Sequence, residues 1–252
     1  MSSVRGLRRQ AAFGATVLMA LGWAVVAAPA TAPSGNAAGI ALARSVKQTY
    51  ATIPIESYAE HGFIWMAASE GKQSSFTWEF GQGPYRGLYP ATEHGEVALR
   101  NGNVSWWRDD LNPGRCTAAG LCNQIPVEVV LSSSGLFYAF GDASHHTCYA
   151  RLRGTAPFVV GKPVWSVYGD FQAPARTGAN EILTSTYPWS IRGAQPLMAT
   201  EVDTLTPANT RLVTSRVTIS AQPGHQAAPF TFSTSYSYPA AAAAQPAITL
   251  CR

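Results

Sequence analysis

Apolar and polar residues alternate with a period of two along most of the chain beyond position 57, and this alternation predicts β-strands. It is clearest at 57–67 and 75–80. Further strands are predicted at 96–100, 104–108, 125–131, 136–140, 147–153, 157–160, 164–171, 180–187, 197–203, 212–220, 229–238 and 247–251. Alternation of this kind is typical of antiparallel sheets that bury one face.

Helical spacing occurs before these strands, at 37–52. Helical spacing relates Ile40, Ala43, Val46, Lys47 and Tyr50, and Pro54 stops the pattern. The sequence therefore predicts a mainly β (α+β) domain with one N-terminal helix. The strongest turn signal is Asn101-Gly102, which predicts a tight hairpin between two strands.

The first 32 residues have the pattern of a signal peptide. Arg5, Arg8 and Arg9 precede an apolar run, and small residues such as Ala28 and Ala30 follow it. An uncleaved membrane anchor remains an alternative, and the arginine pair leaves Sec and twin-arginine export both open. We expect a signal peptide at 1–32, a flexible start at 33–38 and one β-rich domain at 39–252.

Charge adds little to this picture. The net charge is +4, but three of the basic residues fall in the signal segment, so the rest of the chain is close to neutral. Lys and Arg form no cluster there, so we expect no nucleic acid as a partner. Membrane contact is expected to be transient, or to pass through an uncleaved signal.

Catalytic motifs are missing from the sequence. It contains neither Gly-x-Ser-x-Gly nor His-Glu-x-x-His. The adjacent His145 and His146 would not bind one metal together, because neighbours on a strand point to opposite faces. They suit a polar turn instead. Asp109-Asp110 suits the end of a strand, because adjacent carboxylates seldom flank a glycosidic bond. We therefore expect no enzyme, no metal and no cofactor.

Four cysteines in an exported chain predict two disulfide bonds. Cys116 and Cys122 flank a short glycine-containing segment, which favours a local bridge between them. Cys148 would then pair with Cys251 and close a loop of about 100 residues, worth about 4–5 kcal/mol in the chain-entropy model. Metal binding by Cys148 with the neighbouring histidines is the alternative.

Large aromatic residues alternate on consecutive predicted strands. Phe63, Trp65, Phe76, Trp78 and Trp106 would place a row of rings on one sheet face. One interpretation is ordinary core. The other is a concave sheet face that holds an apolar ligand, because such pockets are mostly apolar with few polar groups.

The layout resembles the LolA/LppX/LprG-like carriers of lipids and lipoproteins. The resemblance rests on a helix, ALARSVKQTY at 41–50, that leads into a long strand at 57–65, and on the hairpin RNGNVSWW at 100–107. A strand and turn at 201–212 and a closing hairpin from 230 complete it. The resemblance implies a curved antiparallel sheet or half-barrel, with the helix packed against it and an acyl-chain cavity. The chain departs from the family in lacking a lipobox cysteine and a recognisable central helical segment.

These features together favour an exported, non-enzymatic protein that binds an apolar ligand such as a lipid in a half-barrel, with the five aromatic residues above lining the apolar face. The alternative is a secreted or surface-anchored protein-binding module without a small-molecule ligand. An extracellular hydrolase with an unrecognised site is the third hypothesis. The oligomeric state is not indicated by the sequence.

Overall fold

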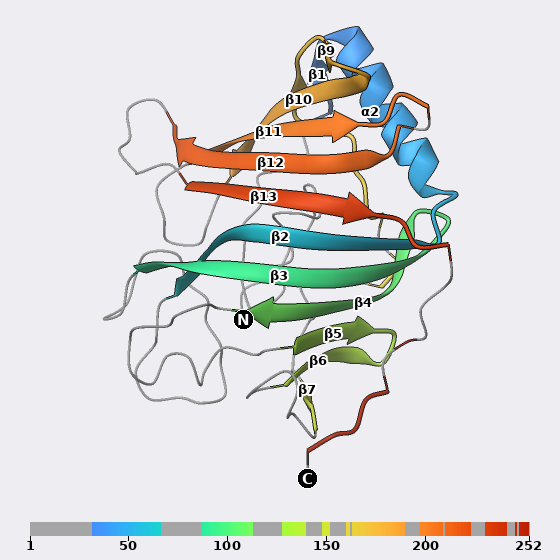
Figure 1. The fold of residues 1–252 in the computed structure, drawn as a ribbon, viewed down its shortest axis with the longest axis vertical. Coiled ribbons are helices and arrows are strands. Elements are labelled where there is room, and N and C mark those ends of the chain that lie inside the picture. Colours follow the sequence, from blue (N-terminus) through green and yellow to red (C-terminus); the bar gives the residue numbers. More distant parts are fainter. Residues whose placement is uncertain are drawn as a thin grey trace, which may run out of the picture.

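The computed structural model describes residues 32–66, 87–112, 128–139, 148–151, 160–161, 163–189, 197–208, 210–222, 230–240, 245 and 247–251. These residues form one 13-stranded sheet with a helix packed against it (Figure 1). The elements are β1 (Ser34–Gly35), α2 (Ala37–Tyr50), β2 (Ile55–Met66), β3 (Gly87–Arg100), β4 (Asn103–Asn112), β5 (Glu128–Ser132), β6 (Gly135–Ala139), β7 (Ala150–Arg151), β8 (Asp170–Phe171), β9 (Ala175–Thr177), β10 (Asn180–Trp189), β11 (Leu197–Leu205), β12 (Leu212–Ala221) and β13 (Phe230–Ser237). The predicted mainly β fold with one N-terminal helix is confirmed.

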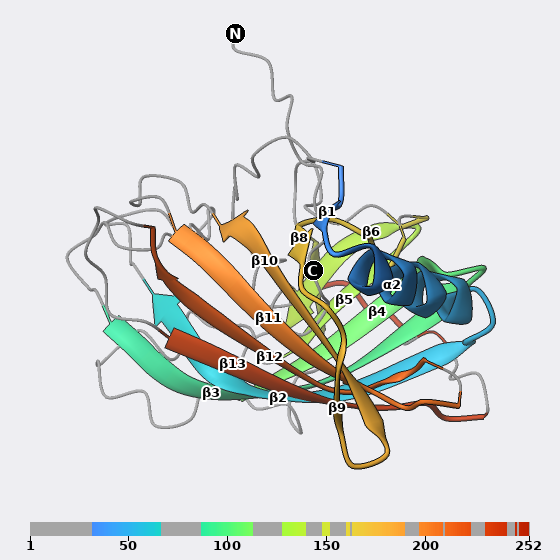
Figure 2. The ribbon, with the colours of Figure 1, turned by 90° about the horizontal axis from the view of Figure 1, so that it is seen from above.

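The sheet has the strand order β1-β8-β10-β11-β12-β13-β2-β3-β4-β5-β6-β7, with β9 paired to β10. Its pairs are antiparallel except for β1 with β8. The pairing of β13 with β2 joins the C-terminal strands to the N-terminal ones. Figure 2 shows that the sheet is curved and open, with α2 over its concave side. The predicted curved sheet is thus confirmed.

Helix α2 begins at a side-chain cap and packs closely on the sheet. The Asn36 side chain accepts hydrogen bonds from the backbone N–H groups of Ala38 (2.9 Å) and Gly39 (3.3 Å), as an N-cap residue should. A Cβ atom at Gly39 would lie 2.3 Å from the Gln172 carbonyl oxygen, so glycine is required for this approach. Although 33–38 was predicted as a flexible start, Ser34–Gly35 forms β1, because β8 offers it a backbone partner.

The predicted hairpin at Asn101-Gly102 is confirmed. Both residues have positive φ, 53° and 74°, as a type I′ turn requires. The flanking strands are longer than the predicted 96–100 and 104–108, since pairing with neighbouring strands extends them to β3 and β4.

Two predicted strands are wrong over most of their length. In 164–171, Asp170–Phe171 is strand, while Val164 and Trp165 lie buried in a segment without regular structure. In 247–251, Leu250 makes an isolated bridge to Tyr149. Both segments are apolar enough to resemble strands. Val164 and Trp165 are buried by packing against neighbouring elements and not by pairing with another strand. The strand at 75–80 and most of that at 157–160 lie outside the described residues.

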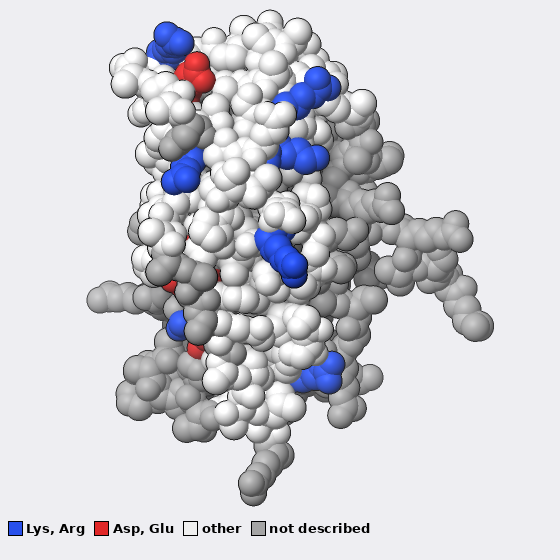
Figure 3. Space-filling view, turned by 90° about the vertical axis from the view of Figure 1, so that its right-hand side faces the viewer, with Lys and Arg blue, Asp and Glu red and all other residues white. Residues whose placement is uncertain are grey.

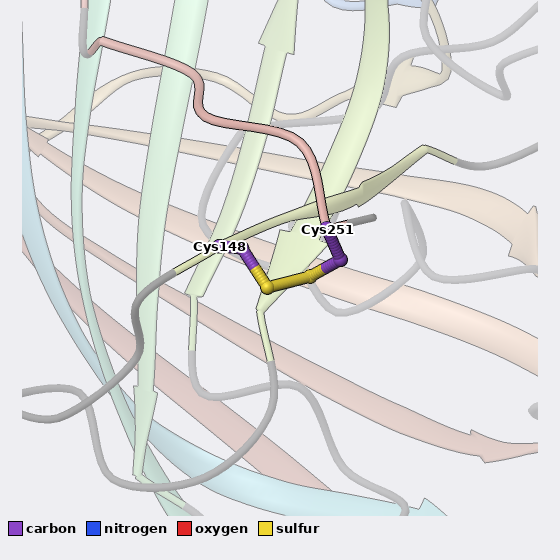
Figure 4. The surroundings of a disulfide bond; sticks show 2 residues. All are labelled: Cys148 and Cys251. Carbon is purple, nitrogen blue, oxygen red and sulfur yellow. A yellow bond between two sulfur atoms is a disulfide. The ribbon is translucent and has the colours of Figure 1, made fainter.

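The predicted disulfide between Cys148 and Cys251 is confirmed, with 4.9 Å between the Cα atoms (Figure 4). It fixes the C-terminal segment beside a buried cluster of Val130, Phe137, Ala139 and Tyr149, on which Ile248 packs. The bond is compatible with an extracytoplasmic location. Cys116 and Cys122 lie outside the described residues. In the part of the chain that the structure describes, no helix is long and apolar enough to cross a membrane.

Candidate functional site

Four carboxyl groups are buried among the described residues. They belong to Glu56, Glu128, Glu201 and Asp203, each at most 3% exposed. Lys and Arg, by contrast, are spread singly over the face drawn in Figure 3. The Glu128 carboxylate pairs with Arg108, with 3.0 Å between Oε1 and Nε. For the other three acids, no ion pair is found within the described ranges, so their environment needs a separate explanation.

These three acids share one face of the sheet, which we call the inner face. Alternation along β11 places Glu201 and Asp203 together, and Asp203 is paired with Ser215 of β12. Ser215 is paired in turn with Thr234 of β13, and Thr234 is paired with Glu60 of β2. Glu56 lies four residues before Glu60 on β2 and therefore on the same face. The last residue of α2 contacts Glu56, so the inner face is the one on which the helix packs.

The first group of buried polar residues is the Glu56 cluster, which consists of Tyr50, Glu56 and Tyr238. The Tyr50 hydroxyl donates a hydrogen bond to Glu56 Oε2, and the Tyr238 hydroxyl lies beside the same carboxyl. Burial raises the pKa of Glu56 to about 7, and the two hydroxyls act in the opposite direction. The cluster therefore connects the helix, β2 and the chain that follows β13.

The aromatic ring of Tyr50 strengthens this connection. It stacks on Trp165, with 6.3 Å between the ring centroids and 8° between their planes. The indole Nε1 of Trp165 donates a 3.0 Å hydrogen bond to the Ala43 carbonyl oxygen of α2. The segment 163–169 is thereby fixed to the helix.

The second group is the Glu201 cluster, which consists of Tyr187, Glu201, Asp203 and Ser215. Ser215 Oγ donates a hydrogen bond to Glu201 Oε1 over 3.3 Å. Burial raises the pKa of Glu201 to about 7, opposed by Tyr187 and Ser215. Burial raises the pKa of Asp203 well above its ordinary value, and the neighbouring charge of Glu201 adds to this effect. The two carboxyl groups compete for ionisation, because a charge on one disfavours a charge on the other.

Several buried polar atoms on the inner face have no hydrogen-bond partner of regular geometry within the described chain. They are Glu56 Oε1, Tyr238 OH, Tyr187 OH, Trp189 Nε1 and Asp203 Oδ1. The Tyr187 hydroxyl is close enough to Glu201 to influence its pKa, but its geometry falls short of a regular hydrogen bond. Such atoms are rare in native proteins, and each costs about 1–3 kcal/mol when left unsatisfied.

Of the five predicted ligand-lining residues, the structure describes the side chain of Trp106. Trp106 is 6% exposed and is paired with Ala98, whereas Trp107 is paired with Val97, the partner of Glu56. Trp106 therefore lies on the face opposite to the inner face.

Four other predicted ligand-lining residues are not placed in a site. Phe63 and Trp65 lie in β2, where the backbone is described, while Phe76 and Trp78 lie outside the described residues. Their ligand-lining role stays a prediction. The histidine pair His145 and His146 is also outside these residues, and the described part of the chain holds no group of three or more His, Cys, Asp or Glu residues suited to a metal.

Sequence reasoning missed the inner-face acids, although a signal for them was present. Glu201 and Asp203 alternate in step with Leu197, Ala199 and Leu205, which are all buried. Two acids that alternate in step with the apolar residues of a strand would be expected on its buried face. Comparisons of the whole chain with protein-family models, curated proteins and solved structures find no match, so the site is interpreted from its own residues.

Proposed function

We propose that this is an exported, non-enzymatic protein that binds an apolar or amphipathic ligand, such as a lipid, against the inner face of its curved sheet. The observation that carries the proposal is the set of unpartnered buried polar atoms on that face. Binding sites for small molecules are mostly apolar, with a few placed polar groups that fix the orientation of the ligand.

The residues around the polar clusters have the required apolar character. Leu197 and Ala199 continue the inner face of β11, and Val217 and Ile219 continue that of β12. All four are buried. A ligand with an apolar chain and a polar end would match this combination of an apolar face with isolated hydrogen-bonding groups.

Native mass spectrometry of the exported protein, followed by organic extraction, tests the proposal. A co-purifying molecule of defined mass supports it and gives the ligand class. Protein that carries no ligand, and that binds no added fatty alcohol or fatty amine, contradicts it. That result would favour the protein-binding module.

A matched pair of isosteric variants tests the location of the ligand. Val217→Thr places a hydroxyl on the inner face, whereas Val202→Thr places one on the opposite face of the neighbouring strand. We expect the first to weaken binding of dodecanol by about tenfold and the second to leave it unchanged. Thermal unfolding of both variants shows whether they are folded. Equal effects on binding would contradict the inner-face location.

A further inference from the structure

When its two acids are ionised, the Glu201 cluster contains more hydrogen-bond acceptors than donors. Two carboxyl groups lie side by side on one strand, and Ser215 donates to one of them. Within the described residues neither acid has a cationic partner. Buried carboxylates are normally paired with a cation or fully hydrogen-bonded. The cluster therefore has the composition of a site for a positively charged donor group.

A second observation points to a ligand at this place. The Tyr187 hydroxyl, on a side chain 3% exposed, lies beside Glu201 without a regular hydrogen-bond partner. Asp203 Oδ1 is likewise buried and unpartnered. The phenol oxygen and the carboxyl oxygens provide acceptors for three hydrogen bonds. The edge-on packing of Tyr168 against Tyr187, with 5.1 Å between the centroids, adds an aromatic wall.

We propose that the Glu201 cluster binds the primary ammonium group of an amphipathic ligand. An ammonium group has three donors and no acceptor, so it matches the three acceptor groups of Glu201, Asp203 and Tyr187. It also supplies the missing positive charge, and aromatic rings attract such cations. The inference rests on the proposed function, because the apolar part of the ligand would lie along Ala199 and Leu197.

A calcium ion fits this cluster less well. Calcium takes six to eight oxygen ligands, and the cluster reaches six only if both carboxyl groups bind through both oxygens and the hydroxyls of Ser215 and Tyr187 bind as well. An ammonium group is about as small as one water molecule and needs three acceptors. The count of oxygen atoms therefore favours the ammonium group.

The segment 163–169 contacts the cluster through Tyr168, which packs on Tyr187, and it is the element that a ligand would displace. It has no helix or strand hydrogen-bonding pattern beyond a single bridge from Pro163 to Asn103. It is anchored by the Val164 backbone N–H, which donates to the Gly102 carbonyl oxygen over 2.9 Å, and by Trp165. Tyr168 then packs on Tyr187 from this segment. Opening of the segment would break these contacts and the 2.9 Å hydrogen bond from the Ser34 backbone N–H to the Gly169 carbonyl oxygen, but it would not separate the long strands of the sheet.

Equilibrium dialysis with probes that share one alkyl chain tests the inference. The probes are dodecylamine, dodecanol and dodecyltrimethylammonium, with the alcohol kept below its solubility limit and the two cationic probes below their critical micelle concentrations. We expect dodecylamine to bind at least about tenfold more tightly than dodecanol, because it adds charge-assisted hydrogen bonds. The trimethylated probe lacks N–H donors and should lose most of this advantage.

Amino-acid substitutions then test whether the preference for dodecylamine over dodecanol depends on the Glu201 cluster. Asp203→Asn should reduce the preference for dodecylamine over dodecanol to about twofold or less. Tyr187→Phe removes one hydroxyl without changing the packing and should reduce the preference by a smaller factor. Asp170→Asn, at an exposed acid of β8, is the control and should leave it unchanged. Thermal unfolding confirms that each variant is folded.

The outcomes separate the inference from the proposed function. Equal binding of dodecylamine and dodecanol overturns the ammonium site and leaves the proposed function intact. Failure of all three probes to bind contradicts both. A preference for dodecylamine that survives both Asp203→Asn and Tyr187→Phe places the ammonium group elsewhere and overturns this site. Stabilisation by Ca²⁺ that Asp203→Asn removes, without any preference for dodecylamine, identifies a metal site instead.

Discussion

Replacing Glu56 by glutamine removes a buried carboxyl group whose ionisation opposes folding. Burial raises its pKa from 4.5 to about 7. The folded state thus binds this proton more tightly than the unfolded state, so the contribution to stability is complete below pH 4.5 and is lost as the pH rises through about 7. A pKa difference of this size corresponds to about 3 kcal/mol.

Glutamine preserves the acceptor for the Tyr50 hydroxyl and never becomes charged. We therefore expect Glu56→Gln to be more stable than the unsubstituted protein by about 2 kcal/mol at pH 8.5, and to differ from it by less than about 1 kcal/mol at pH 4.5. Urea unfolding followed by tryptophan fluorescence, with the disulfide bonds intact, measures both differences. The buried Glu201 also contributes to the pH dependence in both proteins, so the comparison isolates Glu56.

A surface acid provides the control for this experiment. Glu181 pairs with Arg176 at 3.5 Å, and both side chains are partly or largely exposed. Glu181→Gln should change stability by less than about 1 kcal/mol at either pH, because such pairs contribute little. If Glu56→Gln instead destabilises the protein equally at pH 4.5 and 8.5, folding does not raise the pKa of Glu56 and the reasoning is refuted.

Three further predictions concern stability. Cys148→Ser should lower the free energy of unfolding by about 4–5 kcal/mol, since the bond to Cys251 spans 103 residues; an unchanged urea midpoint would contradict this. Gly102→Ala should cost about 1–2 kcal/mol, because φ is 74° there, and circular dichroism on heating measures the loss. Trp106→Ala should cost about 3–5 kcal/mol for a buried ring.

Local chemistry explains how much of this fold could be predicted from the sequence. The helix at 37–52 ends at Tyr50 in the structure, within two residues of its prediction, because its spacing and the following Pro54 are local properties. The hairpin at Asn101-Gly102 follows from the conformational freedom of two residues. The strands β10 to β13 were located by alternation, and they begin or end within two residues of the predicted positions.

Only the tertiary structure determined which strands are neighbours in the sheet and which elements cover its inner face. Nothing local specifies that β13 enters between β12 and β2, because that order depends on pairing between segments far apart in sequence. Alternation also assigns Glu201 and Asp203 to one face of a strand without indicating how that face is covered. Burial by α2 and 163–169 gave the acids their raised pKa values and brought Tyr50 to Glu56 and Tyr187 to Glu201. Hydrophobic pattern is a property of each strand, whereas a polar cluster arises where several strands and a covering segment meet.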